Sequence, residues 1–193
     1  MAWSSAVLIA EPGEEPISVD QAKEFVSIDA DVEEFDALLS SFIEAARGHV
    51  EAVTSTRLVE QTIELQADEW SDLLALPIGP VSEVVSISYE DALGVAQSVD
   101  ANAYELTGAG LARGIRTKVG HGWPHGIRHA VGVIRVRLTV GYESLPAPIK
   151  AALLLMVSDQ FAFRESGVVG ASTSDMKSSM QVNALLGNHR IWL

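Results

Sequence analysis

The feature of the sequence that most constrains the fold is the stretch from residue 145 to residue 165, which contains its most apolar run. Pro146 and Pro148 suit the first turn of a helix, where a missing backbone N–H costs nothing. The apolar positions that follow recur every three or four residues, and further leucines widen this stripe to nearly the whole circumference. The uninterrupted apolar run, residues 151–157, is far shorter than the roughly 20 residues that span a bilayer. We therefore expect a central core helix covered on several sides by other elements, and no membrane association.

Length and composition indicate one domain, or a domain with a sizeable insertion. The 193 residues can bury a substantial core. The chain has no cysteine, so it forms no disulfide and no thiolate metal site, as suits a reducing compartment. The first residues carry no positive charge, and the apolar run at residues 6–10 is too short for a signal peptide. We expect synthesis in the cytoplasm.

The charge is strongly negative and unevenly distributed. A formal net charge of −13 argues against a general nucleic-acid binder, because Lys and Arg supply affinity for phosphate. Residues 1–60 have 13 acidic and three basic side chains, whereas residues 106–142 have no acidic and six basic ones. Two interpretations are open: two solvated faces, or complementary surfaces between subunits. The six bases are Arg113, Arg116, Lys118, Arg128, Arg135 and Arg137.

Two helices are predicted near the N-terminus. Ser18 followed by Gln21 is a capping-box pattern that opens a short helix. Asp31 is predicted to cap a longer helix that runs to about Val53 with apolar residues at helical spacing. Acidic side chains are favoured in the first turns of a helix by its dipole. The first turns of the longer helix should contain Glu33, Glu34 and Asp36.

From about residue 56 the sequence changes to short, β-branched segments with partial alternation, which predict strands. Asp91 to Gly94 is predicted to form a hairpin turn. In the last segment the alternation slips once around Ile134 and Arg135, which indicates either a bulge or a strand buried on both faces. The predicted strands cover residues 56–66, 81–91, 94–99, 103–107, 114–119 and 130–142.

The C-terminal part combines a Ser- and Gly-rich segment with an apolar end. Residues 166–180 offer little to build a core, and we expect them to be flexible. A short helix should follow from Gln181, with too much apolar surface to remain solvated. This end is predicted to dock on a partner protein, the alternative being that Trp192 packs onto its own helical body. The docking candidates are Val182, Leu185, Leu186, Arg190, Ile191 and Trp192.

Three histidines are spaced by four residues, as metal ligands on one helix face would be. They are His121, His125 and His129. Glycines and a Trp-Pro pair interrupt the segment, so it should not be helical, and the regular spacing then has no geometric meaning. We expect instead a loop that Trp123 anchors onto the sheet.

Other motifs with possible chemistry also fail. The glycines of residues 107–114 are spaced too widely for a dinucleotide fingerprint, and a strand pattern follows them. Asp29 and Asp31 could begin a calcium loop, but Glu34 stands where glycine is required. No GxSxG, HExxH, P-loop or cysteine nucleophile is present. We therefore predict no catalytic residue, no metal and no cofactor, with a site formed only by the fold as the alternative.

Taken in order, several segments resemble the phage head-to-tail connectors, the adaptor family of long-tailed phages and of the gene transfer agents derived from them. No segment is specific alone, and the resemblance rests on their order and spacing over nearly the whole chain. The Ser-rich segment before the last helix departs from the pattern. The segments are PISVDQAKEFVSID (16–29), AARGHVEAVTSTRLVEQT (45–62), LPIGPVSEVVSISYEDALG (76–94), WP (123–124), VRLTVGYESLPAPIKAALLLMV (136–157) and LLGNHR (185–190).

The resemblance implies an α+β fold: a helical bundle with an inserted β-rich subdomain. The bundle would comprise two N-terminal helices, one long C-terminal core helix and a short terminal helix. The expected division is residues 1–56 for the N-terminal helices, 57–144 for the β-rich insertion, 145–166 for the core helix, and 167–193 for the flexible segment and docking helix.

The resemblance also implies a non-enzymatic virion protein in the neck of a phage or phage-like particle, assembled in the bacterial cytoplasm. It would form a ring, twelvefold like the portal, that links the DNA-filled head to a tail-side connector or stopper protein. From the net charge of −13 we further hypothesise that any DNA channel through the ring is lined mainly by acidic side chains, so that DNA passes without specific binding. The alternative is a small cytoplasmic enzyme or ligand-binding β domain flanked by helices.

The charge blocks suggest how such a ring would close. Acidic surface of the N-terminal helices would face basic surface of the β region in the next subunit, as in a heterologous contact. The candidate interface residues are Glu33, Glu34 and Asp36 on one side, and Arg113, Arg116, Lys118 and Arg128 on the other.

Overall fold

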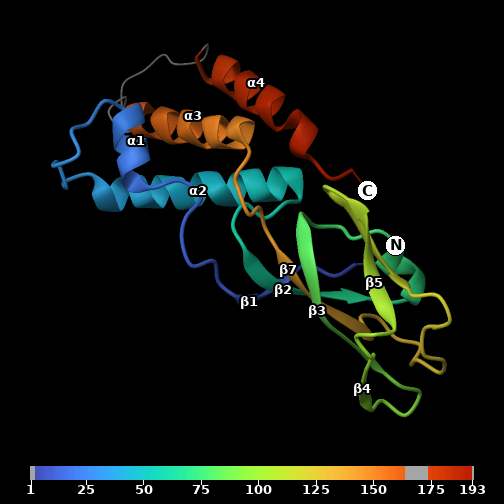
Figure 1. Ribbon diagram of the computed structural model, residues 1–193. Helices are drawn as coiled ribbons and strands as arrows, with labels where there is room; N and C mark the ends of the chain where they lie inside the picture. Colours follow the sequence, from blue (N-terminus) through green and yellow to red (C-terminus); the bar gives the residue numbers. More distant parts are fainter. Residues whose placement is uncertain (1–2, 164–173, 193) are drawn as a thin grey trace. The chain divides into compact units, whose positions relative to one another are not determined.

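The computed structural model describes residues 3–163 and 174–192 (Figure 1). The chain forms two compact units. Met1–Gly13, Glu60–Tyr142 and Ile191–Leu193 make the β unit, and Glu14–Val59 and Glu143–Arg190 make the helical unit. Within the described residues, no helix is both long enough and apolar enough to cross a membrane.

The β unit is built on a five-stranded sheet in the order β1-β2-β7-β3-β4, with antiparallel neighbours. A separate hairpin consists of β5 and β6, and a 3₁₀ turn, η1, follows β2. The strands are β1 (Val7–Ala10), β2 (Gln61–Ala67), β3 (Val81–Glu90), β4 (Ala96–Ser98), β5 (Tyr104–Ala109), β6 (Ala112–Thr117) and β7 (Ile134–Val140), and η1 is Trp70–Leu74.

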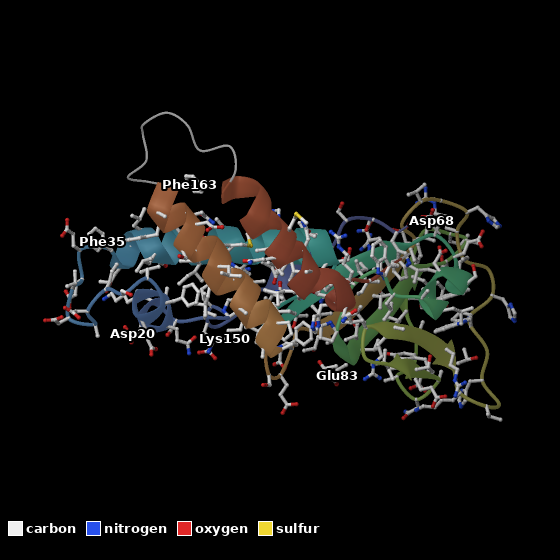
Figure 2. All side chains as sticks on the ribbon, turned by 90° about the horizontal axis from the view of Figure 1, so that it is seen from above. Asp20, Phe35, Asp68, Glu83, Lys150 and Phe163 are labelled. Carbon is white, nitrogen blue, oxygen red and sulfur yellow. The ribbon has the colours of Figure 1, made fainter. Side chains whose placement is uncertain are left out.

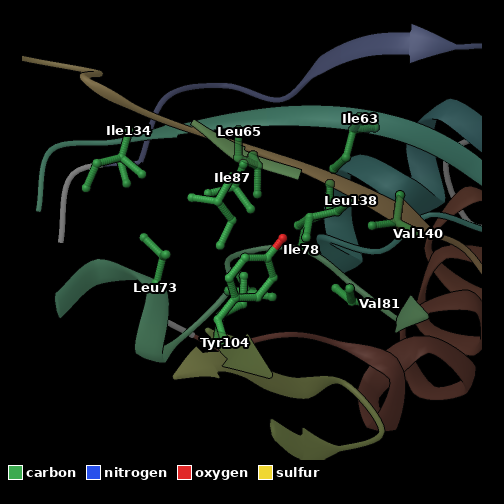
Figure 3. Close-up of a cluster of buried hydrophobic side chains, with 14 of the residues drawn as sticks. Ile63, Leu65, Leu73, Ile78, Val81, Ile87, Tyr104, Ile134, Leu138 and Val140 are labelled. Atoms are coloured by element: carbon green, nitrogen blue, oxygen red, sulfur yellow. The ribbon is translucent and has the colours of Figure 1, made fainter. Parts of the chain in front are cut away.

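One face of this sheet forms the core of the β unit. Along β2 and β7 every second residue is buried, which is the strand period with one face turned inward. Side chains of η1 and of the β5–β6 hairpin, including Leu73 and Tyr104, belong to the same buried cluster (Figure 3). The opposite face is polar, and there Arg137 of β7 pairs with Glu64 of β2 at 2.8 Å.

The helical unit contains α1 (Val19–Phe25), α2 (Asp36–Thr54), α3 (Ala147–Phe163) and α4 (Ser174–Leu186), followed by the 3₁₀ turn η2 (Gly187–His189). α3 is the predicted core helix, and α1, α2 and α4 all pack against it. Its buried residues include Ile149, Leu153 and Val157. At one end of the unit Phe35 meets Phe161 edge to face, with ring centroids 5.6 Å apart, and Figure 2 shows Phe35 and Phe163 at this same end.

The predicted fold class, a helical bundle with an inserted β-rich subdomain, is wrong. The β part is a unit with its own core and a five-stranded sheet, and it takes its edge strand β1 from the N-terminus. β1 was not predicted from the sequence for two reasons. The strand is only four residues long, and its partner strand β2, which begins at Gln61, is far away in the sequence. A short strand is stabilised by such a distant pairing, which local pattern does not record.

Local signals at the helix ends were only partly correct. Ser18 and Gln21 form the predicted capping box. Asp31 does not cap α2, which begins at Asp36 after Phe35 and has no side-chain cap. Glu33 and Glu34 therefore lie in the preceding loop. α4 begins at Ser174, before the predicted start at Gln181, and the rest of the segment expected to be flexible, residues 166–173, lies outside the described residues.

In the β unit the predicted hairpin turn at Asp91 is confirmed, since the Asp91 carboxylate accepts the backbone N–H groups of Leu93 and Val95. The slip in the apolar alternation around Ile134 and Arg135 was predicted to reflect a bulge or a strand buried on both faces, and neither is its cause. β7 alternates regularly from Ile134, and Val131 lies before it in an exposed turn. Register shifts occur instead in β3.

Candidate assembly surfaces

Two of the apolar docking candidates are buried within the chain. Val182 and Leu186 are 6% and 1% exposed, and the helix that carries them, α4, packs on α3. Leu185 is half-buried. The apolar face of α4 is therefore largely occupied by the chain itself.

Of the docking candidates after α4, Arg190 forms a hydrogen bond within the chain, Ile191 is half-buried and Trp192 is exposed. Arg190 donates from Nε to the carbonyl oxygen of Val53, at 2.9 Å, in the last turn of α2. Ile191 is half-buried and lies beside Gly79. A Cβ added at Gly79 would be 3.3 Å from Cδ1 of Ile191. Trp192 is 77% exposed. Among the docking candidates, Trp192 has the highest exposed fraction.

A partly buried ionic network in the C-terminal half of α2 was not found from the sequence. Arg47 holds Glu15 through two hydrogen bonds of 2.8 and 3.1 Å, and hydrogen bonding to this carboxylate raises the pKa of Arg47 against the lowering effect of burial. Glu51, 8% exposed, accepts the backbone N–H of Leu58 at 2.9 Å. The only sequence signal was the spacing of four residues, about one helical turn, between Arg47 and Glu51, and such spacing is common on solvated faces.

Of the predicted acidic interface residues, Asp36 already forms an ion pair within the helical unit. Asp36 lies 2.5 Å from the buried ammonium of Lys23, which also donates to the carbonyl oxygen of Ala30. Glu33 and Glu34 are exposed. Glu33 and Glu34 thus remain available for contact with another molecule, and Asp36 has a partner already.

The basic block of the sequence is not a basic surface in the structure. Four of its arginines pair with glutamates that β2, β3 and β5 bring beside them from outside the block. The pairs are Arg116–Glu105, Arg128–Glu90, Arg135–Glu90 and Arg137–Glu64, with N–O distances of 2.8, 3.1, 3.3 and 2.8 Å.

Two of the predicted interface bases have no such partner. Arg113 and Lys118 form no ion pair among the described residues, and Nε of Arg113 is buried without a hydrogen-bond partner there. Candidate interface residues of the β unit therefore separate into two kinds. Arg116 and Arg128 are neutralised locally, and Arg113 and Lys118 carry charge that the unit itself does not balance.

The histidine segment is the loop that the sequence predicted. Trp123 stacks on Trp70 with ring centroids 4.7 Å apart, and Nε1 of Trp70 donates to the carbonyl oxygen of Pro124 at 3.1 Å. Tyr104 lies near the same rings. Within the described residues, no three His, Asp or Glu side chains are grouped so that they could hold a metal ion.

The glycines of residues 107–114 have packing roles. Gly108 and Gly110 adopt positive φ in the β5–β6 hairpin turn. At Gly114 a Cβ would lie 2.1 Å from the carbonyl oxygen of Leu74, so only glycine lets the end of η1 approach β6 this closely. The backbone N–H of Leu76 donates to the carbonyl oxygen of Arg113 beside it, at 2.9 Å.

The groups with shifted pKa do not converge on a pocket. Burial raises the pKa of Tyr104 and Tyr142, and the backbone N–H of Val95 together with Gln97 lowers the pKa of Asp91. A surface pocket of about 520 Å³ in the β unit is lined by other residues, among them Asp68 and His129.

Comparison with known proteins gives one kind of match. No protein-family model and no curated protein sequence matches the chain. Solved structures do match. A chain from the neck of an empty gene transfer agent (GTA) particle, computed with C6 symmetry, is 23% identical with a TM-score of 0.76, covering 98% of this chain and 97% of that one. The chain shares its fold with a GTA neck chain.

Two further structures support the same fold. A chain from the virion of a native GTA particle is 23% identical, with a TM-score of 0.75 over 98% of this chain and 97% of that chain. A chain from the neck of a native GTA particle computed with C12 symmetry is 21% identical, with a TM-score of 0.65 over 96% and 97% of the two chains. The resemblance predicted from the sequence is confirmed at the level of the fold.

Proposed function

We propose that this chain is a structural, non-enzymatic subunit of the neck of a phage-like particle of the gene transfer agent type. The observation that carries this proposal is the match to GTA neck and virion chains over 98% of this chain and 97% of those chains. Both units are therefore present in the similar chains, and the match does not rest on one common subdomain. The match supports a structural role in such a particle, and the finer connector function remains part of the proposal.

The proposed assembly is a ring of twelve copies beneath the portal, joined on its other side to a tail connector or stopper protein. The similar chains belong to necks computed with C6 and C12 symmetry, which supports cyclic packing of copies. DNA would pass through the ring without being held. The net charge of −13 supports this, because carboxylates repel phosphates and only Lys and Arg contacts would add affinity.

In this proposal the C-terminal segment still contacts the portal, with fewer residues than the sequence suggested. Val182, Leu186 and Arg190 serve the fold of the helical unit. Trp192 would be the anchor, since exposed aromatic side chains are typical centres of binding energy in interfaces. Leu185 and Ile191, both half-buried, would line its surroundings.

Charge complementarity between neighbouring copies is likewise proposed for fewer residues. Glu33 and Glu34 would face Arg113 and Lys118 of the next copy, because these four are not already paired. Asp36, Arg116 and Arg128 would contribute only by exchanging their present partners. Such exchange yields little net energy at an exposed site.

Deletion of the gene in a producing strain tests the function. The expected result is DNA-filled heads without tails in negative-stain electron microscopy, with tailed particles restored by the gene supplied in trans. Particles labelled through a tag on the chain should carry the label at the neck. Tailed particles of normal yield after deletion would show that the chain is not a neck component.

A further inference from the structure

β1 is an edge strand with an unusual composition for an edge. Val7, Leu8 and Ile9 are 51%, 47% and 46% exposed, and the strand contains no charged residue and no proline. Among the described residues it pairs only with β2, so its outer backbone edge is open. Natural sheets usually block such edges with charge, proline or cover, because an open apolar edge is a template for another strand.

The opposite edge of the same sheet is also partly open. β4 covers only Ser88, Tyr89 and Glu90 of β3, so the first part of β3, from Val81 to Ser86, pairs within the described residues only with β7. Val85 in this part is 49% exposed. One sheet thus carries two incomplete edges: β1 with three exposed apolar side chains, and the open part of β3 with Val85, the exposed Glu83 and two register shifts against β7.

The directions of the two edge strands are compatible with pairing between copies. β1 runs antiparallel to β2, β2 to β7, and β7 to β3, so β1 and β3 run in opposite directions. A second copy placed by rotation about an axis along the strands keeps these directions. Its β3 would then lie antiparallel beside β1 of the first copy, and the two sheets would become continuous.

We infer that β1 of one copy pairs with the open part of β3, residues 81–86, of the next copy. This inference rests on the proposed ring, since a contact that joins one edge to the opposite edge is heterologous and closes when copies repeat around an axis. Strand addition supplies main-chain hydrogen bonds, and apolar residues of both edges supply specificity. Pairing of β1 with β1 of a second copy would instead be isologous and would stop at a dimer.

Cysteine cross-linking tests the pairing, because the natural chain contains no cysteine. Val7→Cys or Leu8→Cys is combined with Val84→Cys or Val85→Cys, which gives four double variants. Val7 and Leu8 are neighbours in β1 and point to opposite faces, whereas a register shift lies between Val84 and Ser86 in β3, so all four combinations are tested. Directly opposed residues bring their Cβ atoms to about 5 Å, within reach of a disulfide after small adjustment. The purified, concentrated proteins are oxidised mildly and separated on non-reducing gels.

The expected result is a ladder of covalent multimers from at least one double variant, with little cross-linking of Leu8→Cys alone. Leu8→Cys combined with Val119→Cys is the matched control, since Val119 is fully exposed in the turn after β6, outside both edge strands. Leu8→Lys should raise the concentration needed for association at least about tenfold, which corresponds to about 1.4 kcal/mol. Leu93→Lys, at a residue 89% exposed in the β3–β4 turn, should leave association unchanged.

The outcomes separate this inference from the proposed function. Oligomers seen by light scattering that give no edge cross-link, or that survive Leu8→Lys, would overturn the β1–β3 pairing and leave the ring intact. Dimers from Leu8→Cys alone would replace it with β1–β1 pairing. A chain that stays monomeric at the highest concentrations would overturn both the pairing and self-assembly of the ring.

Discussion

Arg190 and Val53 are joined by a hydrogen bond across 137 positions of the sequence: Nε of Arg190 donates to the carbonyl oxygen of Val53, 2.9 Å away. Val53 lies in the last turn of α2, where carbonyl oxygens have no partner within the helix. A guanidinium there also interacts favourably with the negative end of the helix dipole. The segment after α4 is therefore part of the helical unit's structure.

Arg190→Ala should lower the free energy of unfolding by about 1.5 to 2 kcal/mol, because it removes a charge-assisted hydrogen bond at a partly buried helix end. Urea unfolding followed by circular dichroism measures the change. Arg116→Ala is the matched control, since its pair with Glu105 is exposed and should contribute less than about 1 kcal/mol. Equal effects of the two substitutions would show that the bond to Val53 is not special.

Leu186→Ala and Trp192→Ala should have opposite consequences. Leu186 is 1% exposed, so its truncation should cost about 2 to 4 kcal/mol of stability. Trp192 is 77% exposed, and its removal should change stability by less than about 0.5 kcal/mol. Thermal unfolding measures the first effect, and sedimentation with purified portal rings measures binding. We expect Trp192→Ala to lose portal binding while folding normally.

The control for this pair is Leu93→Ala, which truncates an apolar residue 89% exposed in a different part of the chain. It should affect neither stability nor portal binding. Normal portal binding by Trp192→Ala would contradict the proposed docking role of Trp192, whatever the stability of the variant.

The elements that the sequence predicted well are those held by local pattern. The core helix α3, the capping box of Ser18 and Gln21, and the turn at Asp91 each depend on residues close in sequence. Two of the features missed in the fold depend on distant partners. β1 needs β2, and the start of α2 at Asp36 accompanies an ion pair with Lys23 and a contact of Phe35 with Phe161.

In the candidate surfaces, too, the features that the sequence missed depend on residues distant in the chain. A block of arginines with no acidic residue nearby in the sequence predicts a basic surface. In a sheet, however, neighbouring strands bring acidic residues from elsewhere in the chain beside these arginines. Glu64, Glu90 and Glu105 reach the arginines in this way. Apolar residues at the C-terminus were recognised correctly as needing cover. The sequence did not indicate that α3 of the same chain covers Val182 and Leu186.

Gly114→Ala should destabilise the β unit by about 3 kcal/mol or more. The new Cβ would lie 2.1 Å from the carbonyl oxygen and 2.6 Å from the carbonyl carbon of Leu74, both backbone atoms that cannot move aside independently. Gly122→Ala is the control, since nothing lies within 4 Å of its added Cβ. Urea unfolding compares both with the natural protein. A Gly114→Ala variant of normal stability would mean that η1 and β6 do not approach as closely as described.

Tyr142→Phe should stabilise the protein by up to about 1 kcal/mol at neutral pH. The Tyr142 hydroxyl is buried and has no hydrogen-bond partner among the described residues, so removing it relieves an uncompensated desolvation. Tyr89→Phe provides a control for replacing a half-buried tyrosine outside this position. A loss of about 1 kcal/mol in Tyr142→Phe would instead reveal that the hydroxyl has a partner.

The same substitution should change the response to alkaline pH. Burial raises the pKa of Tyr142 above its ordinary value of 10.0, so the folded protein keeps this proton at pH values where the unfolded chain releases it. The stability linked to Tyr142 is then fully present below about pH 10 and falls as the pH rises from there through the folded-state pKa. In Tyr142→Phe this contribution is absent, and the decline measured by urea unfolding between pH 9 and pH 11 should be shallower. Tyr104, whose pKa is also raised by burial, remains in the variant, so a smaller decline should persist. An identical alkaline decline in the natural protein and the variant would show that Tyr142 titrates alike in the folded and unfolded states.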